Sequence, residues 1–157
     1  MTNKRIEIDG GVLVAHDGSQ HSQEALRVAA GYAQALGLPV TVARAWSLST
    51  APQPTTKEFG YVPPIDEFEA ATLAELNSHA DVVRADYPGV TITATVVQGN
   101  AVSTIVDASE NAGLVVVGSR GLGGFKGLLL GSVSEQIVRH AHCPVLVSRE
   151  RGDLTSD

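Results

Sequence analysis

Five short runs of mostly apolar residues recur along the chain, and each is typical of a buried β-strand. Their residues do not alternate between apolar and polar, as they would in strands with one face in water. Continuous apolar strands of this kind belong to parallel sheets that are covered on both faces. The predicted strands span residues 11–16, 39–46, 90–97, 114–117 and 144–148.

The segments between the strands carry apolar residues at helical spacing. In the first segment the predicted buried face, which recurs every third or fourth residue, consists of Ala25, Val28, Ala29, Tyr32, Ala33 and Leu36. Ser19 or Ser22 is expected to cap the start of this helix, and Gly37 is expected to end it. Because many of these residues are alanines, the helix can pack close to a sheet.

Three further helices are expected. One covers residues 65–87, the next can be capped by Asn100 and Ser103, and the last covers residues 132–142. Ser132 and Glu135 have the spacing of a capping box at the start of the last helix. Strands and helices therefore alternate along the chain, which predicts an α/β domain whose parallel sheet lies between two layers of helices.

Two polar turns are expected at the carboxyl ends of the strands, where ligands bind in sheets of this class. One is Asp17-Gly18-Ser19 after the first strand, and the other starts at Gly118 after the fourth. If these two strands are neighbours, as in the strand order 3-2-1-4-5, the turns face one cleft. The residues alone predict an anionic ligand between two turns and leave its identity open.

The second turn is a glycine-rich loop. Gly118-Ser119-Arg120-Gly121 follows the strand, and after nine further residues Gly131-Ser132 opens the predicted helix. Glycines allow the backbone to approach a ligand closely and to adopt a positive φ. The N–H groups at the start of a helix attract anions. This arrangement is typical of a phosphate-binding loop.

The charges of this loop favour the same interpretation. No Asp or Glu occurs between Glu110 and Glu135, although the whole chain has a net charge of −6. Lys126 is expected to steer an anion toward the loop, and Arg120 either contacts phosphate or points to solvent. The alternative is a flexible loop in which Ser132 only caps the helix.

The composition is that of an ordinary globular protein. With 157 residues, 43% hydrophobic and 18% charged, the chain is long enough for one domain with its own core. An isoelectric point near 5.3 argues against a general nucleic-acid binder. A single cysteine suits a reducing compartment, and the sequence has neither a secretory segment nor a long apolar run. We therefore expect a cytoplasmic protein that binds neither nucleic acid nor a membrane.

The expected domain spans residues 11–149. It follows a flexible lead-in over residues 1–10 and precedes a polar tail over residues 150–157. The connection over residues 47–64 contains four prolines and is long for an irregular loop, and such loops are more often functional than structural. Its role stays open.

The fifth strand is an edge of the sheet in the strand order 3-2-1-4-5. Its central residues carry no charge: Val145, Leu146 and Val147. Apolar edge strands invite pairing with another chain. A homodimer through this strand is therefore expected.

The spacing Gly118-x-x-Gly121-x9-Gly131-Ser132 resembles the ATP-binding signature of the universal stress protein family. The flanking sequences are similar as well: VAHDGS from 14, GSVSEQIV from 131 and HCPVLV from 142. The likeness covers residues 11–149. It implies a Rossmann-like fold of the adenine nucleotide alpha hydrolase type, with five parallel strands in the order 3-2-1-4-5 between four helices. It also implies ATP as the ligand and a dimer through the last strand.

The resemblance further implies which residues form the site. Asp17 would contact the nucleoside or the metal–phosphate region, and Ala45 would form a wall beside the adenine. The residues that would hold the ribose and phosphates are Gly118, Gly121, Gly131, Ser132, Val133 and Ser134. Asp17 and Ser132 could also help to hold Mg²⁺ that arrives with the nucleotide. His16 departs from the apolar residue that the family leads us to expect before Asp17.

Binding is favoured over turnover. Hydrolysis of ATP needs an oriented water, and the segment 111–134 contains no carboxylate that could position one. Our first hypothesis is a nucleotide-dependent regulatory or stress-protective module. A slow ATPase or nucleotidyl-transfer enzyme of the same fold is the second, and a binder of another adenine nucleotide such as cyclic AMP is the third. For Asp17 the structural alternative is an Asx turn that bonds only its own backbone.

Overall fold

The five predicted strands form one parallel sheet in the expected order, β3-β2-β1-β4-β5. The computed structural model describes residues 5–48, 50–52, 64–120 and 130–149. The strands are β1 (Val12–Ala15), β2 (Val40–Trp46), β3 (Ile92–Gln98), β4 (Leu114–Gly118) and β5 (Val145–Ser148). The helices are α1 (Gln20–Leu36), α2 (Ile65–Asp86), α3 (Ala101–Ser109) and α4 (Ser132–His140). The predicted boundaries agree closely with these.

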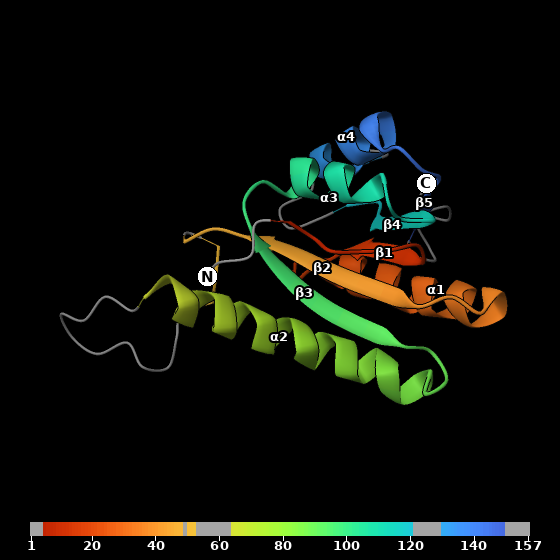
Figure 1. Cartoon of the computed structure of the whole chain (residues 1–157), viewed down its shortest axis with the longest axis horizontal. Helices are drawn as coiled ribbons and strands as arrows, with labels where there is room; N and C mark the ends of the chain where they lie inside the picture. Colours follow the sequence, from red (N-terminus) through yellow and green to blue (C-terminus); the bar gives the residue numbers. More distant parts are fainter. Residues whose placement is uncertain (1–4, 49, 53–63, 121–129, 150–157) are drawn as a thin grey trace, which may run out of the picture.

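Two layers of helices cover the sheet, as apolar strands require. Helices α1 and α2 pack on one face, and α3 and α4 pack on the other (Figure 1). Successive residues of a strand point to opposite faces. Val12 and Val14 accordingly belong to the α1–α2 core, whereas Leu13 belongs to the α3–α4 core. With both faces covered, the strand ends are the places where this fold can accept a ligand.

Helix α1 begins and ends where the sequence indicates. Ser19 Oγ accepts a hydrogen bond from the N–H of Ser22, at 3.2 Å, and Gly37 ends the helix in the left-handed region with φ 69°. The buried stripe consists of Ser22, Ala25, Leu26, Ala29, Ala30 and Ala33. The prediction that Tyr32 and Leu36 belong to the buried face is wrong, because Tyr32 is 50% exposed and Leu36 is 61% exposed. The helix packs against the sheet through its alanines, so these two larger side chains lie at the edge of the contact between helix and sheet.

The strand register brings the ends of β1 and β4 together. The two strands are parallel neighbours, with Val14 paired to Val116, so Asp17 and Gly118 leave the sheet at the same edge. From there the chain continues into α1 on one face and toward α4 on the other. The crevice between two such strands is the point at which α/β sheets bind ligands.

The described part of the lead-in is held more firmly than we expected. Ile6 is buried and Ile8 is half-buried against the α3–α4 core, and the N–H of Gly10 donates to the carbonyl of Asn111 at 2.7 Å. Most of the connection over residues 47–64, and the whole tail over residues 150–157, lie outside the described residues.

Candidate functional site

The turn after β1 is held by hydrogen bonds to its own neighbourhood. The N–H of Asp17 donates to Ser22 Oγ at 3.3 Å, and the N–H of Gly18 donates to His16 Nδ1 at 3.1 Å. The N–H of Ser19 donates to Asp17 Oδ1 at 2.9 Å, which is the Asx turn considered as the structural alternative for Asp17. Three successive N–H groups are therefore occupied. A carboxylate has about four lone-pair sites, so Asp17 can still accept hydrogen bonds from a ligand.

Gly118 lies where α1 crosses the end of β4. A Cβ atom at this position would lie 2.9 Å from the carbonyl oxygen of His21 in α1, so a larger residue would push the helix away from the strand. The prediction that the loop glycines adopt a positive φ is wrong for Gly118 and Gly131. Gly118 does not belong to the glycines with positive φ, and Gly131 has φ −68°. At Gly118 the missing side chain allows the helix and the strand to pack closely.

The start of α4 is set by a backbone bond at the base of the glycine-rich loop. The N–H of Gly131 donates to the carbonyl of Ser119 at 2.7 Å. Gly131 is consequently the extended N-cap residue, and the helix starts at Ser132. The predicted capping box is wrong, because the N-cap is Gly131 and not Ser132, and Glu135 accepts a hydrogen bond from Arg139 instead. Within the described residues, the first N–H groups of α4 thus lack a capping side chain.

Two buried serines lie beside this helix start. Ser134 Oγ donates to the carbonyl of Gly118 at 2.6 Å and ties α4 to the end of β4. Ser119 is only 1% exposed, and its Oγ has no hydrogen-bond partner within the described part of the chain. A buried hydroxyl without a partner is costly, so this atom is suited to a ligand. Ser119 was not among the site residues predicted from the sequence, although its position between two motif glycines indicated it.

The remaining predicted residues are more scattered. Ala45 is half-buried near the end of β2, which lies across β1 from β4. Ser132 and Val133 are exposed on the first turn of α4, and Arg120 is half-buried. Gly121 lies outside the described residues. Hydrogen bonds therefore connect glycine and serine residues at the end of β4 and the start of α4. None of these bonds involves Ala45.

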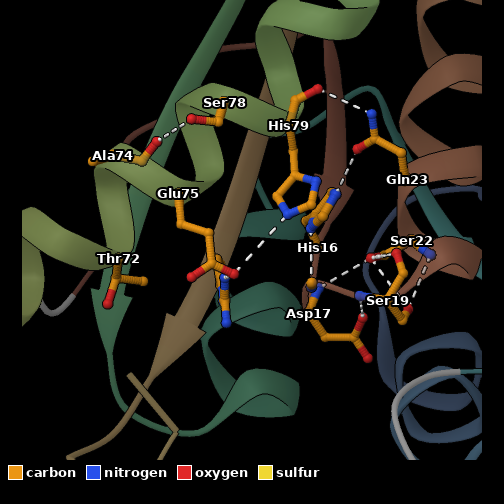
Figure 2. Close-up of polar contacts among 12 residues, drawn as sticks. His16, Asp17, Ser19, Ser22, Gln23, Thr72, Ala74, Glu75, Ser78 and His79 are labelled. Atoms are coloured by element: carbon orange, nitrogen blue, oxygen red, sulfur yellow. Dashed lines mark hydrogen bonds and ion pairs between the residues drawn. The ribbon is translucent and has the colours of Figure 1, made fainter. Parts of the chain in front are cut away.

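Next to the Asp17 turn lies a partly buried polar cluster that was not predicted from the sequence (Figure 2). It consists of His16, Gln23, Arg44, Glu75 and His79. Arg44 Nη1 donates to Glu75 Oε1 at 3.0 Å, and His16 is 3% exposed. An arginine within the apolar run of β2 was the available signal, because a buried charge requires a partner.

Burial favours the neutral form of the His16 imidazole. Burial is the largest influence and lowers the pKa of His16 from its ordinary value of 6.5. The Gln23 hydrogen bond and Asp17 raise this pKa, whereas His79 and Arg44 lower it, and the net direction is downward. Nδ1 accepts the N–H of Gly18, so the proton resides on Nε2, which donates to Gln23 Oε1 at 2.9 Å.

In the described ranges, no group of three His, Cys, Asp or Glu side chains is arranged to hold a metal ion. None of the helices in those ranges combines the length and the apolar character that crossing a bilayer requires.

Comparison with known sequences gives one consistent family. The sequence model of the universal stress protein family matches residues 11–149. A universal stress protein of Mycobacterium tuberculosis is 37% identical over 141 residues, which are 88% of this chain and 45% of the relative. The chain thus spans about half the length of that relative. A universal stress protein of Thermus aquaticus is 35% identical over 144 residues, covering 88% of this chain and 97% of the relative.

Solved structures agree with the sequence relatives. A universal stress protein crystallised in complex with cAMP is 29% identical with a TM-score of 0.63, over 90% of this chain and 96% of that chain. A universal stress protein from Archaeoglobus fulgidus is 25% identical with a TM-score of 0.63, over 89% and 93% of the two chains. On its sheet order, its glycine-rich loop and these relatives, the chain belongs to the universal stress protein family.

Proposed function

We propose that this chain binds an adenine nucleotide, with ATP as its main ligand, between the ends of β1 and β4. The observation that carries the proposal is the buried Ser119 hydroxyl, which has no partner in the described chain and lies beside the start of α4, where the N-cap is a glycine without a capping side chain. N–H groups at a helix start and a nearby hydroxyl are suited to phosphate oxygens. Family membership and the relative crystallised with cAMP support an adenine nucleotide as the ligand class.

The two sides of the cleft differ in chemistry, and this difference orients the nucleotide. The N–H groups of the turn over residues 17–19 are occupied, so the turn presents the Asp17 carboxylate, which accepts hydrogen bonds from hydroxyl or amino groups. The α4 side presents donors. We therefore place the ribose and base toward Asp17 and Ala45. The phosphates lie toward Gly118, Arg120, Gly121, Gly131, Ser132, Val133 and Ser134.

Mg²⁺ would accompany the phosphates of ATP. The Ser132 hydroxyl is an oxygen ligand of the kind that this ion prefers, and Mg²⁺ keeps few protein ligands when it binds together with substrate phosphates. Asp17, the other metal ligand considered from the sequence, is assigned here to the nucleoside instead. The ion would neutralise part of the phosphate charge. Gly131 and Ser132 would supply the N–H donors beside it.

Nucleotide occupancy, rather than turnover, is the role that we propose. In the cleft we assign the carboxylate of Asp17, which already accepts the N–H of Ser19, to the nucleoside and not to a reacting water. The protein would then act as a nucleotide-dependent regulatory or stress-protective module in the cytoplasm. A slow ATPase or nucleotidyl-transfer enzyme is the alternative.

Cyclic AMP is the second candidate ligand. It is favoured by the relative crystallised with cAMP, which is 29% identical over 90% of this chain. Cyclic AMP carries one phosphate, so it would use fewer of the donors at the start of α4 than ATP does. Competition between the two nucleotides for the purified protein distinguishes them.

Calorimetric titration of the purified chain with Mg-ATP tests the proposed function. We expect saturable binding that Ser132→Ala weakens by about tenfold, because a hydrogen bond to a charged group contributes about 1.5–3 kcal/mol. Gly121→Val should weaken binding further by blocking the approach of the backbone to phosphate.

Ser78→Ala is the matched control. Ser78 is exposed on α2, where its Oγ donates to the carbonyl of Ala74 at 3.1 Å, so this variant should bind ATP as the wild type does. A wild-type chain that binds no adenine nucleotide would contradict the proposal. Equal affinities of Ser132→Ala, Gly121→Val and the wild type would remove the phosphate site from the glycine-rich loop.

A further inference from the structure

His16 connects the Asp17 turn to two helices. Its Nδ1 accepts the N–H of Gly18 at 3.1 Å, and its Nε2 donates to Gln23 Oε1 of α1 at 2.9 Å. The Gln23 amide in turn donates to the carbonyl of His79 in α2 at 3.0 Å. Figure 2 shows this chain of hydrogen bonds running from the turn to α2. A single buried side chain therefore links the end of β1 to both helices of this layer.

A second part of the cluster, Arg44 of β2, lies against the same turn. A Cβ atom at Gly18 would lie 3.5 Å from Arg44 Nη2, so the guanidinium lies against the turn. Arg44 is paired with Glu75 at 3.0 Å, and Glu75 lies 4.0 Å from His79 Nε2. The rings of His16 and His79 have centroids 4.9 Å apart. The turn is thus fixed by a bonded and packed framework on the side that faces α2.

The bond from Gly18 to His16 decides what the turn offers to a ligand. Gly18 has φ 89°, and successive backbone N–H groups in turns of this kind form concavities that bind anions. If the Gly18 N–H were not occupied, the turn would present one backbone donor that could compete for phosphate with the start of α4, because the neighbouring N–H groups of Asp17 and Ser19 have other acceptors. With the imidazole on it, the turn presents the Asp17 carboxylate instead, which repels phosphate and accepts donors.

We infer that His16 is a positioning residue of the nucleotide site, which occupies the Gly18 N–H and thereby directs the Asp17 carboxylate toward the nucleoside half of the ligand. The inference rests on the proposed function. His16 acts through Gly18 and Asp17 and does not itself bind the nucleotide. The chemistry it selects is a ligand with hydroxyl or amino donors at one end and phosphate at the other.

Two substitutions separate the two hydrogen bonds of His16. In His16→Asn, the side-chain oxygen stands close to the position of Nδ1 and can accept the N–H two residues along the chain, as Asn does in Asx turns. In His16→Gln, the longer side chain reaches toward Gln23 and leaves the Gly18 N–H without its acceptor. Each variant loses one hydrogen bond, so a purely structural role would affect both alike.

Calorimetric titration with Mg-ATP distinguishes the roles. We expect His16→Gln to weaken ATP binding by about three- to tenfold, which is the effect of one net hydrogen bond, and His16→Asn to bind within about twofold of the wild type. His140→Asn, on an exposed histidine of α4, controls for the loss of an imidazole. Equal affinities of the Asn and Gln variants, whether weakened or not, overturn the inference.

Amide hydrogen exchange of Gly18 in the ligand-free wild type supplies a second test, which also decides if a variant fails to fold. Slow exchange of the Gly18 N–H is expected, and exchange at the rate of an exposed amide overturns the inference. A wild type that binds neither ATP nor cAMP while Gly18 is protected would instead show that the proposed function has failed and that the turn is held as described.

Discussion

At the scale of single residues, the burial of His16 makes the stability of the fold depend on pH. Burial lowers the pKa of its imidazole from 6.5, so the unfolded chain binds this proton more readily than the folded chain. Above pH 6.5 both states are neutral at His16, and its contribution to stability is complete. As the pH falls from 6.5 toward the lowered folded pKa, protonation of the unfolded state removes that contribution.

We predict that the free energy of unfolding falls more steeply over this window in the wild type than in His16→Asn. Urea unfolding at a series of pH values from about 7.5 to 5 measures both slopes. The two proteins differ only at residue 16, so a difference between their slopes arises from this substitution. A difference between the two proteins that does not change with pH would contradict the assignment.

The places of the candidate site residues in the fold could be predicted from the sequence, but many of their contacts could not. Asp17 and Gly118 follow apolar strands, and that position alone marks them as residues at a ligand-binding edge. The reason for glycine at 118 is the carbonyl of His21 in α1. The partner of Arg44 is Glu75 in α2. Both facts depend on how distant segments pack, which no local pattern encodes.

At the scale of elements, the start of α4 is held by two bonds to the end of β4. Gly131 N–H donates to the Ser119 carbonyl at 2.7 Å, and Ser134 Oγ donates to the Gly118 carbonyl at 2.6 Å. Because the helix is anchored in this way, its first N–H groups need no capping side chain to be fixed in space. Ser134 therefore has a structural role here, whereas Ser132 is left exposed.

Ser134→Ala is accordingly predicted to lower the free energy of unfolding by about 1–2 kcal/mol, because it removes a buried hydrogen bond. Ser132→Ala is the matched control, two residues earlier in the same helix, and it should change the free energy of unfolding by less than about 0.5 kcal/mol. Denaturant unfolding of both variants measures this. Equal losses in the two proteins would show that Ser134 does not anchor the helix.

The arrangement of elements was predictable because short continuous apolar runs alternate along the chain with segments whose apolar residues have helical spacing. Mostly apolar strands separated by helical repeats require a covered parallel sheet, and the sheet order is as expected. Finer features were wrong where tertiary contacts decide. The hydrogen bond between Gly131 and Ser119 sets the start of α4 in place of the predicted capping box at Ser132. Tyr32 and Leu36 are exposed because α1 packs on its alanines.

At the scale of the whole molecule, β5 is an edge strand that pairs only with β4 in the described sheet. Its residues Val145, Leu146 and Val147 are half-buried, and an apolar edge of this kind invites pairing with a second chain. Two copies related by a two-fold axis would satisfy both edges and close the assembly. A homodimer through β5 stays our prediction.

Sedimentation at micromolar concentration should therefore give twice the chain mass of 16.3 kDa. The double variant Val145→Lys/Val147→Lys should sediment as a monomer, since buried lysines at a paired edge are unfavourable. Thr93→Lys, on an exposed position of the opposite edge strand β3, should remain dimeric. A wild type of 16.3 kDa with and without ATP would rule the dimer out.

The central claim is that an adenine nucleotide binds between the ends of β1 and β4. The most direct test is to titrate the ¹⁵N-labelled chain with Mg-ATP and to map the amide shifts. The account predicts saturable changes at three segments, which are residues 17–19, 118–119 and 131–134. No saturable change, or changes confined to another part of the molecule, would contradict it.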